Sequence, residues 1–129
     1  MLMAMFTLER IDHVALSSTD VERSVRWYMD VLGFERRHDG LWNGVPVFIG
    51  KGDIAVAIFP VNGNRQEREE PAPKLLHFAM RADRKNFGSA QDGLTSAGIP
   101  FEFQDHGIAH SIYLRDPDGH EIEITTYEL

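Results

Sequence analysis

The sequence predicts an α+β fold built from two successive βαβββ modules, and two observations carry this prediction. Strand-like alternation and helix-like periodicity follow one another in the same order in both halves of the chain. His13 and His77, each in a strand-like segment, are 64 residues apart, and Gly33 and Gly98, each after a helical pattern, are 65 apart. Such a repeat indicates tandem modules. Because each module has to bury one face of its sheet, we expect a curved mixed sheet around a cup, with the helices outside.

The length and composition are those of a single globular domain. A chain of 129 residues with 43% apolar residues is long enough to bury a core. We expect one domain over residues 1–129, with module one at about 10–60, a linker at 61–74 and module two at about 75–127. The linker is charged, contains proline and has no apolar periodicity, so it is either a connector or a mobile loop.

Charge and cysteine content exclude several classes of partner. The net charge is −7, from 13 basic and 20 acidic residues, and no basic block is longer than a pair. Neither a nucleic acid nor an anionic membrane surface is therefore an expected partner. No apolar run approaches the roughly 20 residues that span a bilayer. The sequence has no cysteine, which excludes disulfides and thiolate ligands and is compatible with the cytoplasm, where we expect the protein.

Module one is expected to contain four strands and one helix. Its first strand is Arg10 to Ser17, and Thr19 to Glu22 fits a capping box that opens a helix. Gly33 ends this helix because glycine readily takes the left-handed conformation found after a helix C-terminus. A loop around Trp42 interrupts the strands that follow. These strands are 34–38, 45–49 and 54–59.

Module two repeats this order. A strand at 75–82 leads to Asp83, which can cap a helix that continues through Ala97, and Gly98 ends it. The remaining strands are 101–103, 111–115 and 121–127. The last two flank the turn Asp116-Pro117-Asp118-Gly119, in which proline presets φ and glycine accepts positive φ.

The two strands around this turn have one apolar and one polar face. Ile112, Leu114, Ile122 and Ile124 point one way, since side chains alternate along a strand. The opposite face carries polar side chains, which are Ser111, Tyr113, Arg115, Glu121, Glu123 and Thr125. The apolar face predicts burial, and the polar face is the candidate functional surface.

Four segments resemble the vicinal oxygen chelate superfamily, which includes glyoxalase I, bleomycin and fosfomycin resistance proteins and extradiol dioxygenases. They are IDHVAL at 11–16, WYMDVLGFE at 27–35, LLHFAM at 75–80 and DPDGHEIEI at 116–124. The resemblance covers nearly the whole chain, from 10 to 127. It implies the paired βαβββ fold, a homodimer, and a small-molecule substrate bound in the cup.

In metal-binding members of that family the ligands come from the first and last strands of each module. The matching positions here are His13, His77 and Glu123, whereas the strand at 54–59 offers no acid, amide or histidine. Glu121 shares a face with Glu123 and is the alternative ligand by parity, although the DPDGHxIE pattern favours Glu123. His120, in the turn, is expected at the surface.

Two imidazoles and one carboxylate hold a divalent ion and leave positions open for a substrate with two adjacent oxygens. Fe, Mn, Zn, Ni and Co all suit such a set. The alternative is a bleomycin-resistance-type protein that keeps the fold and binds a small molecule without a metal.

The resemblance also indicates residues around the metal. Tyr113 matches a tyrosine that hydrogen-bonds a substrate oxygen in extradiol enzymes, and His106 matches their substrate-contacting loop histidine better than His110 does. A neutral histidine there can transfer a proton. For each of these residues a structural or solvent-exposed position is the competing interpretation. The cup is expected to be lined by Phe48, Ala57, Phe103, Ser111 and Tyr113.

Extradiol-like ring cleavage is the leading reaction, followed by isomerase, lyase or thiol-transfer chemistry. Two departures leave these alternatives open. Residues 61–74 lack the further catalytic histidine that extradiol enzymes carry upstream of the second metal histidine. Residues 100–110 contain no Lys or Arg for the phosphonate that fosfomycin-type transferases bind.

Overall fold

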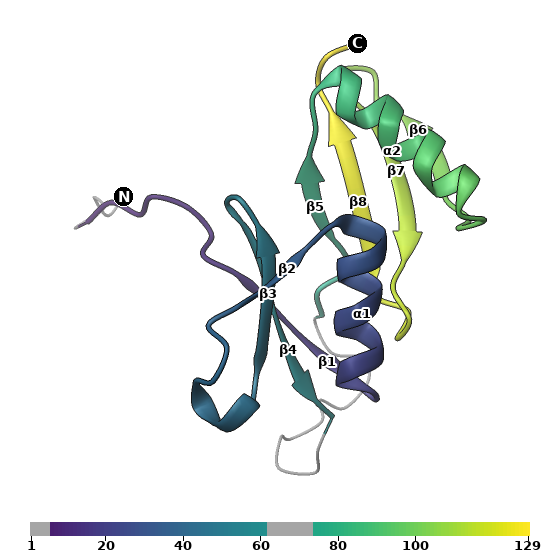
Figure 1. Cartoon of the computed structure of the whole chain (residues 1–129). Helices are drawn as coiled ribbons and strands as arrows, with labels where there is room; N and C mark the ends of the chain where they lie inside the picture. The colour runs from purple at the N-terminus through teal and green to yellow at the C-terminus, as the bar shows by residue number, and fades with distance from the viewer. Residues whose placement is uncertain (1–5, 62–73) are drawn as a thin grey trace.

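The strands of the first module form one four-stranded sheet. The computed structural model describes residues 6–61 and 74–129, so that the expected linker lies almost entirely outside the described residues. The strand order is β1-β4-β3-β2, in which β1 runs parallel to β4 and the other pairs are antiparallel (Figure 1). The elements are β1 (Val14–Ser18), α1 (Val21–Leu32), β2 (Glu35–Arg37), a short 3-10 turn (Trp42–Gly44), β3 (Val47–Lys51) and β4 (Ile54–Pro60).

The second module repeats this arrangement in a second sheet. Its strand order is β5-β8-β7-β6, again with the first strand parallel to the last (Figure 1). The elements are β5 (Phe78–Arg81), α2 (Arg84–Ser96), β6 (Glu102–Asp105), β7 (His110–Arg115) and β8 (Glu121–Thr126). The α+β fold and the tandem βαβββ order are therefore confirmed. The two sheets are open and separate, and each leaves the first strand of its module at an edge.

Both helices begin and end with local hydrogen bonds that the sequence encodes. Asp20, one residue beyond the Thr19 with which the expected capping box starts, is the N-cap of α1 and accepts from the Arg23 amide at 3.1 Å. Gly33 follows α1 with φ 70°, and its N–H donates to the Met29 carbonyl. Asp83 caps α2 by accepting from the Asn86 amide at 2.7 Å. Within the described residues no helix is long and apolar enough to cross a membrane.

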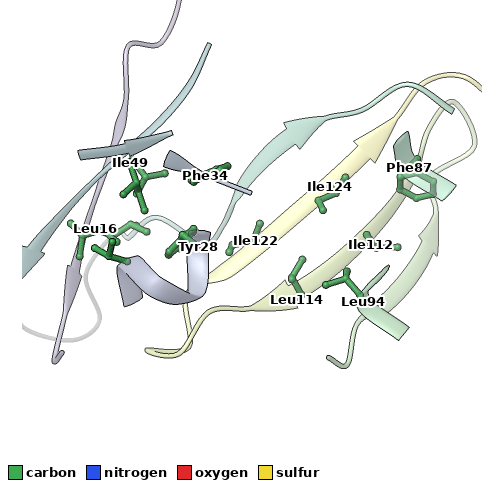
Figure 2. Close-up of a cluster of buried hydrophobic side chains, with 13 residues drawn as sticks. Leu16, Tyr28, Phe34, Ile49, Phe87, Leu94, Ile112, Leu114, Ile122 and Ile124 are labelled. Atoms are coloured by element: carbon green, nitrogen blue, oxygen red, sulfur yellow. The ribbon is translucent and has the colours of Figure 1, made fainter. Parts of the chain in front are cut away.

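A single hydrophobic cluster joins the two modules (Figure 2). Ile112, Ile122 and Tyr28 are fully buried, and Tyr28 of α1 lies between residues of the two sheets. The apolar face expected for the C-terminal hairpin is thus the core face, and each such side chain contributes about 1.5–3 kcal/mol by burial. The cluster is made of Leu16, Val25, Tyr28, Phe34, Ile49, Val56, Ile58, Phe87, Leu94, Ile112, Leu114, Ile122 and Ile124.

The predicted turn between β7 and β8 also fastens the modules together. Asp116 accepts from the backbone amides of Asp118 and His120 at 3.0 and 2.9 Å, which closes the turn. Its other oxygen accepts from the Tyr28 hydroxyl at 2.7 Å. Asp118 accepts from residues at the start of α1, which are Ser18, Thr19, Arg23 and Ser24. A turn of module two therefore holds the first turn of the module-one helix.

Candidate metal and substrate site

The polar face of the second sheet brings His77 and Glu123 into contact. Ala79 of β5 pairs with Glu123 of β8, and His77 lies two residues before Ala79, so its side chain leaves the same face. His77 Nε2 lies 3.0 Å from Glu123 Oε1, and the two side chains are 37% and 12% exposed. Two ligand atoms that bind one ion at about 2.1 Å each, with a right angle between the two bonds, lie about 3 Å from each other. The pair thus fits two neighbouring positions of one ion.

Ser111 fixes the second oxygen of Glu123. The Ser111 hydroxyl is fully buried and donates to Glu123 Oε2 at 2.8 Å. Its Oγ also lies 2.9 Å from Thr125 Oγ1, the next outward-facing residue of β8. Oε1 of Glu123 therefore remains directed at His77, while Oε2 is anchored to the sheet.

Tyr113 and His106 lie next to this pair. Tyr113 is opposite Glu123 in the β7–β8 register. Its ring lies edge-on to the His77 ring, with 5.8 Å between the ring centroids. His106 Nε2 lies 2.9 Å from the Tyr113 hydroxyl. Desolvation, followed by the negative charge of Glu123, raises the pKa of the Tyr113 phenol above its usual value.

His13 lies on the other module, across a cavity from His77. A cavity of about 430 Å³ is lined by residues preceding and within β1, by the start of β4 and by β5, and both histidines border it. In the ranges 6–61 and 74–129 no three His, Cys, Asp or Glu side chains lie close enough to hold a metal ion. The chain thus assembles two of the three expected ligands and leaves the third opposite them.

The sheet face beneath His13 carries an aromatic ring, Phe48, beside a small residue, Ala57. Phe48 pairs with Ala57 in the β3–β4 register, so the two share a face, and the Phe48 ring meets the His13 ring at 5.0 Å. Sequence reasoning missed two further rings here. His38 and Trp42 approach Phe48 at 5.3 and 5.4 Å, and Trp42 is 52% exposed. The one sequence signal for them was a tryptophan bracketed by glycines in the loop that follows β2.

Phe103 lies apart from the other expected lining residues. It pairs with Ile112 in the β6–β7 register, and its ring lies 6.5 Å from that of Phe87 in α2. Glu102 takes the position opposite Tyr113 instead. Since side chains alternate, Phe103 faces the helix side of the sheet and lines no part of the Tyr113 face.

A second cavity adjoins His77 near the β7–β8 turn. It has a volume of about 450 Å³, and its wall carries Lys74, Arg115, His120 and Glu121 beside apolar residues that precede β5. His120 is tied down there, because its Nε2 lies 2.8 Å from the Ser17 carbonyl oxygen. His77 borders both cavities, so it is accessible to small molecules from two sides.

A sequence profile of the Glyoxalase/Bleomycin resistance protein/Dioxygenase superfamily matches residues 10–124. The chain belongs to this superfamily. A lactoylglutathione lyase from Agrobacterium tumefaciens has a similar structure, with a TM-score of 0.74 at 23% identity, over 92% of this chain and 94% of the other. At that identity the similarity concerns the fold alone.

Curated members of the superfamily that resemble this chain differ in reaction. A catechol-2,3-dioxygenase from Bacillus subtilis is 30% identical over 88% of this chain. The glutathione transferase FosA from Serratia marcescens is 26% identical over 91% of this chain and 80% of its own length. This chain spans only 40% of the length of the dioxygenase.

Proposed function

We propose that the protein is a metal-dependent enzyme that acts on a small substrate with two adjacent oxygens. His13, His77 and Glu123 would hold one divalent ion, one of Fe, Mn, Zn, Ni or Co. The observation that carries the proposal is the 3.0 Å approach of His77 Nε2 to Glu123 Oε1, with the Tyr113 ring edge-on to His77 beside it. When bound, the ion would supply Lewis-acid chemistry at a substrate oxygen.

The side chains around the ion have separate tasks in this proposal. Tyr113 would donate a hydrogen bond to one substrate oxygen, since a phenol is protonated at neutral pH and this half-buried residue lies on the Glu123 face. His106, whose Nε2 lies 2.9 Å from that hydroxyl, would reprotonate Tyr113 after the phenol proton has passed to the substrate oxygen, and the exposed imidazole would then take up a proton from solvent. Ser111 keeps the Glu123 carboxylate in one orientation.

Extradiol-like cleavage of an aromatic ring is the leading reaction. An aromatic substrate is supported by the rings of His38, Trp42 and Phe48 beside His13, whereas Ala57 on the same face is fully buried. The similarity to a catechol-2,3-dioxygenase supports it as well, although this chain spans less than half of that protein. Thiol transfer, lyase and isomerase reactions are the alternatives, in keeping with the similarity to FosA.

We place the enzyme in the cytoplasm and infer that it works as a homodimer. Within residues 6–61 and 74–129, the strands β1 and β5 lie at sheet edges, where a second copy can add a strand. The ligand histidines flank these same edges. Light scattering at several concentrations tests this inference, and a strictly monomeric metal-loaded protein would contradict it.

The deciding experiment is elemental analysis of tag-free protein purified anaerobically without chelators. We expect about one equivalent of metal, and its loss in Glu123→Ala. Fe or Mn, with oxygen consumption on catechols, supports ring cleavage, whereas Zn or Ni favours lyase or isomerase chemistry. Absence of metal, no uptake on adding any, and ligand affinity unchanged by EDTA would instead support a metal-free binding protein.

A further inference from the structure

We propose that Asp12 and Glu121 are positioning residues, whose carboxylates engage Nδ1 of His13 and His77 so that each ring presents Nε2 to the ion. This inference rests on the proposed metal site and assigns a role to two carboxylates outside the ligand set. A neutral imidazole has one protonated and one free nitrogen, and only the free nitrogen can bind a metal. An acceptor at Nδ1 fixes which nitrogen that is.

The Asp12–His13 contact is a direct hydrogen bond. His13 Nδ1 lies 2.8 Å from Asp12 Oδ2. The carboxylate can only accept, so Nδ1 is the protonated nitrogen and Nε2 keeps its lone pair. The same ring borders the 430 Å³ cavity and meets Phe48 edge-on at 5.0 Å, which limits its rotation. His13 is thus held as an Nε2 ligand.

Glu121 occupies the corresponding place beside His77. Its Oε2 lies 3.7 Å from His77 Nδ1, slightly beyond hydrogen-bond distance. Its Oε1 lies 3.6 Å from Arg115 Nη2. His77 Nε2 meanwhile faces Glu123. The two glutamates share a face of the sheet, and they therefore lie beside different nitrogens of the His77 ring: Glu121 beside Nδ1 and Glu123 beside Nε2.

Three other histidines show no contact of Nδ1 with a carboxylate among the described residues. In His106, His110 and His120 the nitrogen close to a protein oxygen is Nε2, at 2.9 Å from the Tyr113 hydroxyl, 3.5 Å from Asp105 and 2.8 Å from the Ser17 carbonyl. An Nδ1–carboxylate contact is thus a feature of the two histidines that are the proposed ligands. This coincidence links Asp12 and Glu121 to metal binding.

The first test measures the affinity for Zn²⁺ alone by calorimetry. Asp12→Ala and Glu121→Ala should each weaken binding about 10–100-fold, the usual cost of losing a partner of a ligand histidine. Asp12→Asn and Glu121→Gln keep an acceptor oxygen and should recover most of this loss. Asp53→Ala is the matched control, because Asp53 borders the same cavity, is 85% exposed and contacts only Arg10 among the ion pairs of the described residues. Arg115→Gln removes the contact between Arg115 and Glu121 while keeping Glu121, so it shows how much of the change in Zn²⁺ affinity in Glu121→Ala comes from that contact.

The second test determines directly which ring nitrogen of each histidine binds Zn²⁺ and which is protonated. Long-range ¹H–¹⁵N spectra of the Zn²⁺-loaded protein should show both histidines coordinated through Nε2 and protonated at Nδ1, and a mixture of coordination modes in the Ala variants. Zn²⁺ binding that is lost in Glu123→Ala but equal in Asp12→Ala, Glu121→Ala and Asp53→Ala would overturn the positioning role and leave the metal site intact. Coordination through Nδ1 would overturn it as well. No Zn²⁺ binding by the unaltered protein would remove the proposed function itself.

Discussion

The hydroxyl of Tyr113 lies 2.9 Å from Nε2 of His106, and Tyr113 stands opposite Glu123 on the neighbouring strand. A phenol, an imidazole and a candidate metal ligand are therefore contiguous. The three residues come from β7, from β8 and from the segment between β6 and β7, all in the second module. Because antiparallel neighbours hold them in register, their spacing depends on the sheet.

The Tyr113–His106 pair predicts a selective loss of turnover. Tyr113→Phe removes the donor and keeps the ring, so we expect kcat to fall about 10²-fold or more, the contribution usual for a positioned proton-transfer group. Metal content should not change. His106→Gln should give a similar fall, and the double variant should lose little more than either single variant. Steady-state kinetics with elemental analysis checks this, and additive losses would contradict a shared proton path.

Glu123→Gln separates the ligand role of the carboxylate from its structural role. The amide keeps an oxygen for the Ser111 hydroxyl, which donates to Glu123 at 2.8 Å, but loses the negative charge that a divalent ion requires. We expect metal content near zero with a melting temperature close to that of the metal-free parent protein. Calorimetry and elemental analysis measure both quantities. Metal retained in this variant would shift the ligand role to Glu121.

Much of this site follows from alternation along strands. The period of two predicted that Ser111, Tyr113 and Glu123 share a polar face, because the isoleucines between them had to be buried. The same alternation did not predict the face on which Phe103 lies. In a strand as short as β6 a shift of one residue exchanges the faces, and only pairing with β7 fixes which residue faces Tyr113.

Other parts of the site depend on contacts that no local pattern encodes. Trp42 lies in a loop with φ 56°, where neither helical nor strand periodicity applies. Asp118 meets Ser18 across 100 residues of sequence, and this contact sets how the second module sits on α1. The position of His13 relative to His77 depends on such packing, so the sequence names the candidate ligand residues without predicting how far apart they lie.

The loop rings predict a fluorescence signal for an aromatic ligand. The chain has two tryptophans, and Trp27→Phe leaves only the exposed Trp42. Adding a catechol-like ligand to that variant should quench or shift its emission. Trp42→Phe, which leaves only the partly buried Trp27 of α1, is the matched control and should not respond. Trp42→Ala should weaken ligand binding about 2- to 12-fold, since a ring pair is worth about 0.5–1.5 kcal/mol. Equal responses from both single-tryptophan proteins would exclude Trp42 as a specific contact.

Asp118 predicts how stability depends on pH. Burial raises the pKa of this carboxyl, but hydrogen bonds from Ser18, Thr19 and Ser24 outweigh it, so the pKa in the folded protein lies well below its usual range. A depressed pKa contributes stability above the unfolded-state value, about 3.9, and that contribution is lost as the pH falls from there through the folded value.

We therefore expect Asp118→Asn to lower the free energy of unfolding by about 2–4 kcal/mol at pH 7, since hydrogen bonds to a charged group are worth about 1.5–3 kcal/mol each and are not additive. Urea unfolding of both proteins should show this difference shrinking below pH 4. Asp53→Asn, at an exposed aspartate that caps no helix, should change stability by less than about 0.5 kcal/mol. If the difference in free energy of unfolding between the parent protein and Asp118→Asn stayed constant down to about pH 3, the charge of Asp118 would not contribute to the contact between the modules. Only the shape of the turn would then matter.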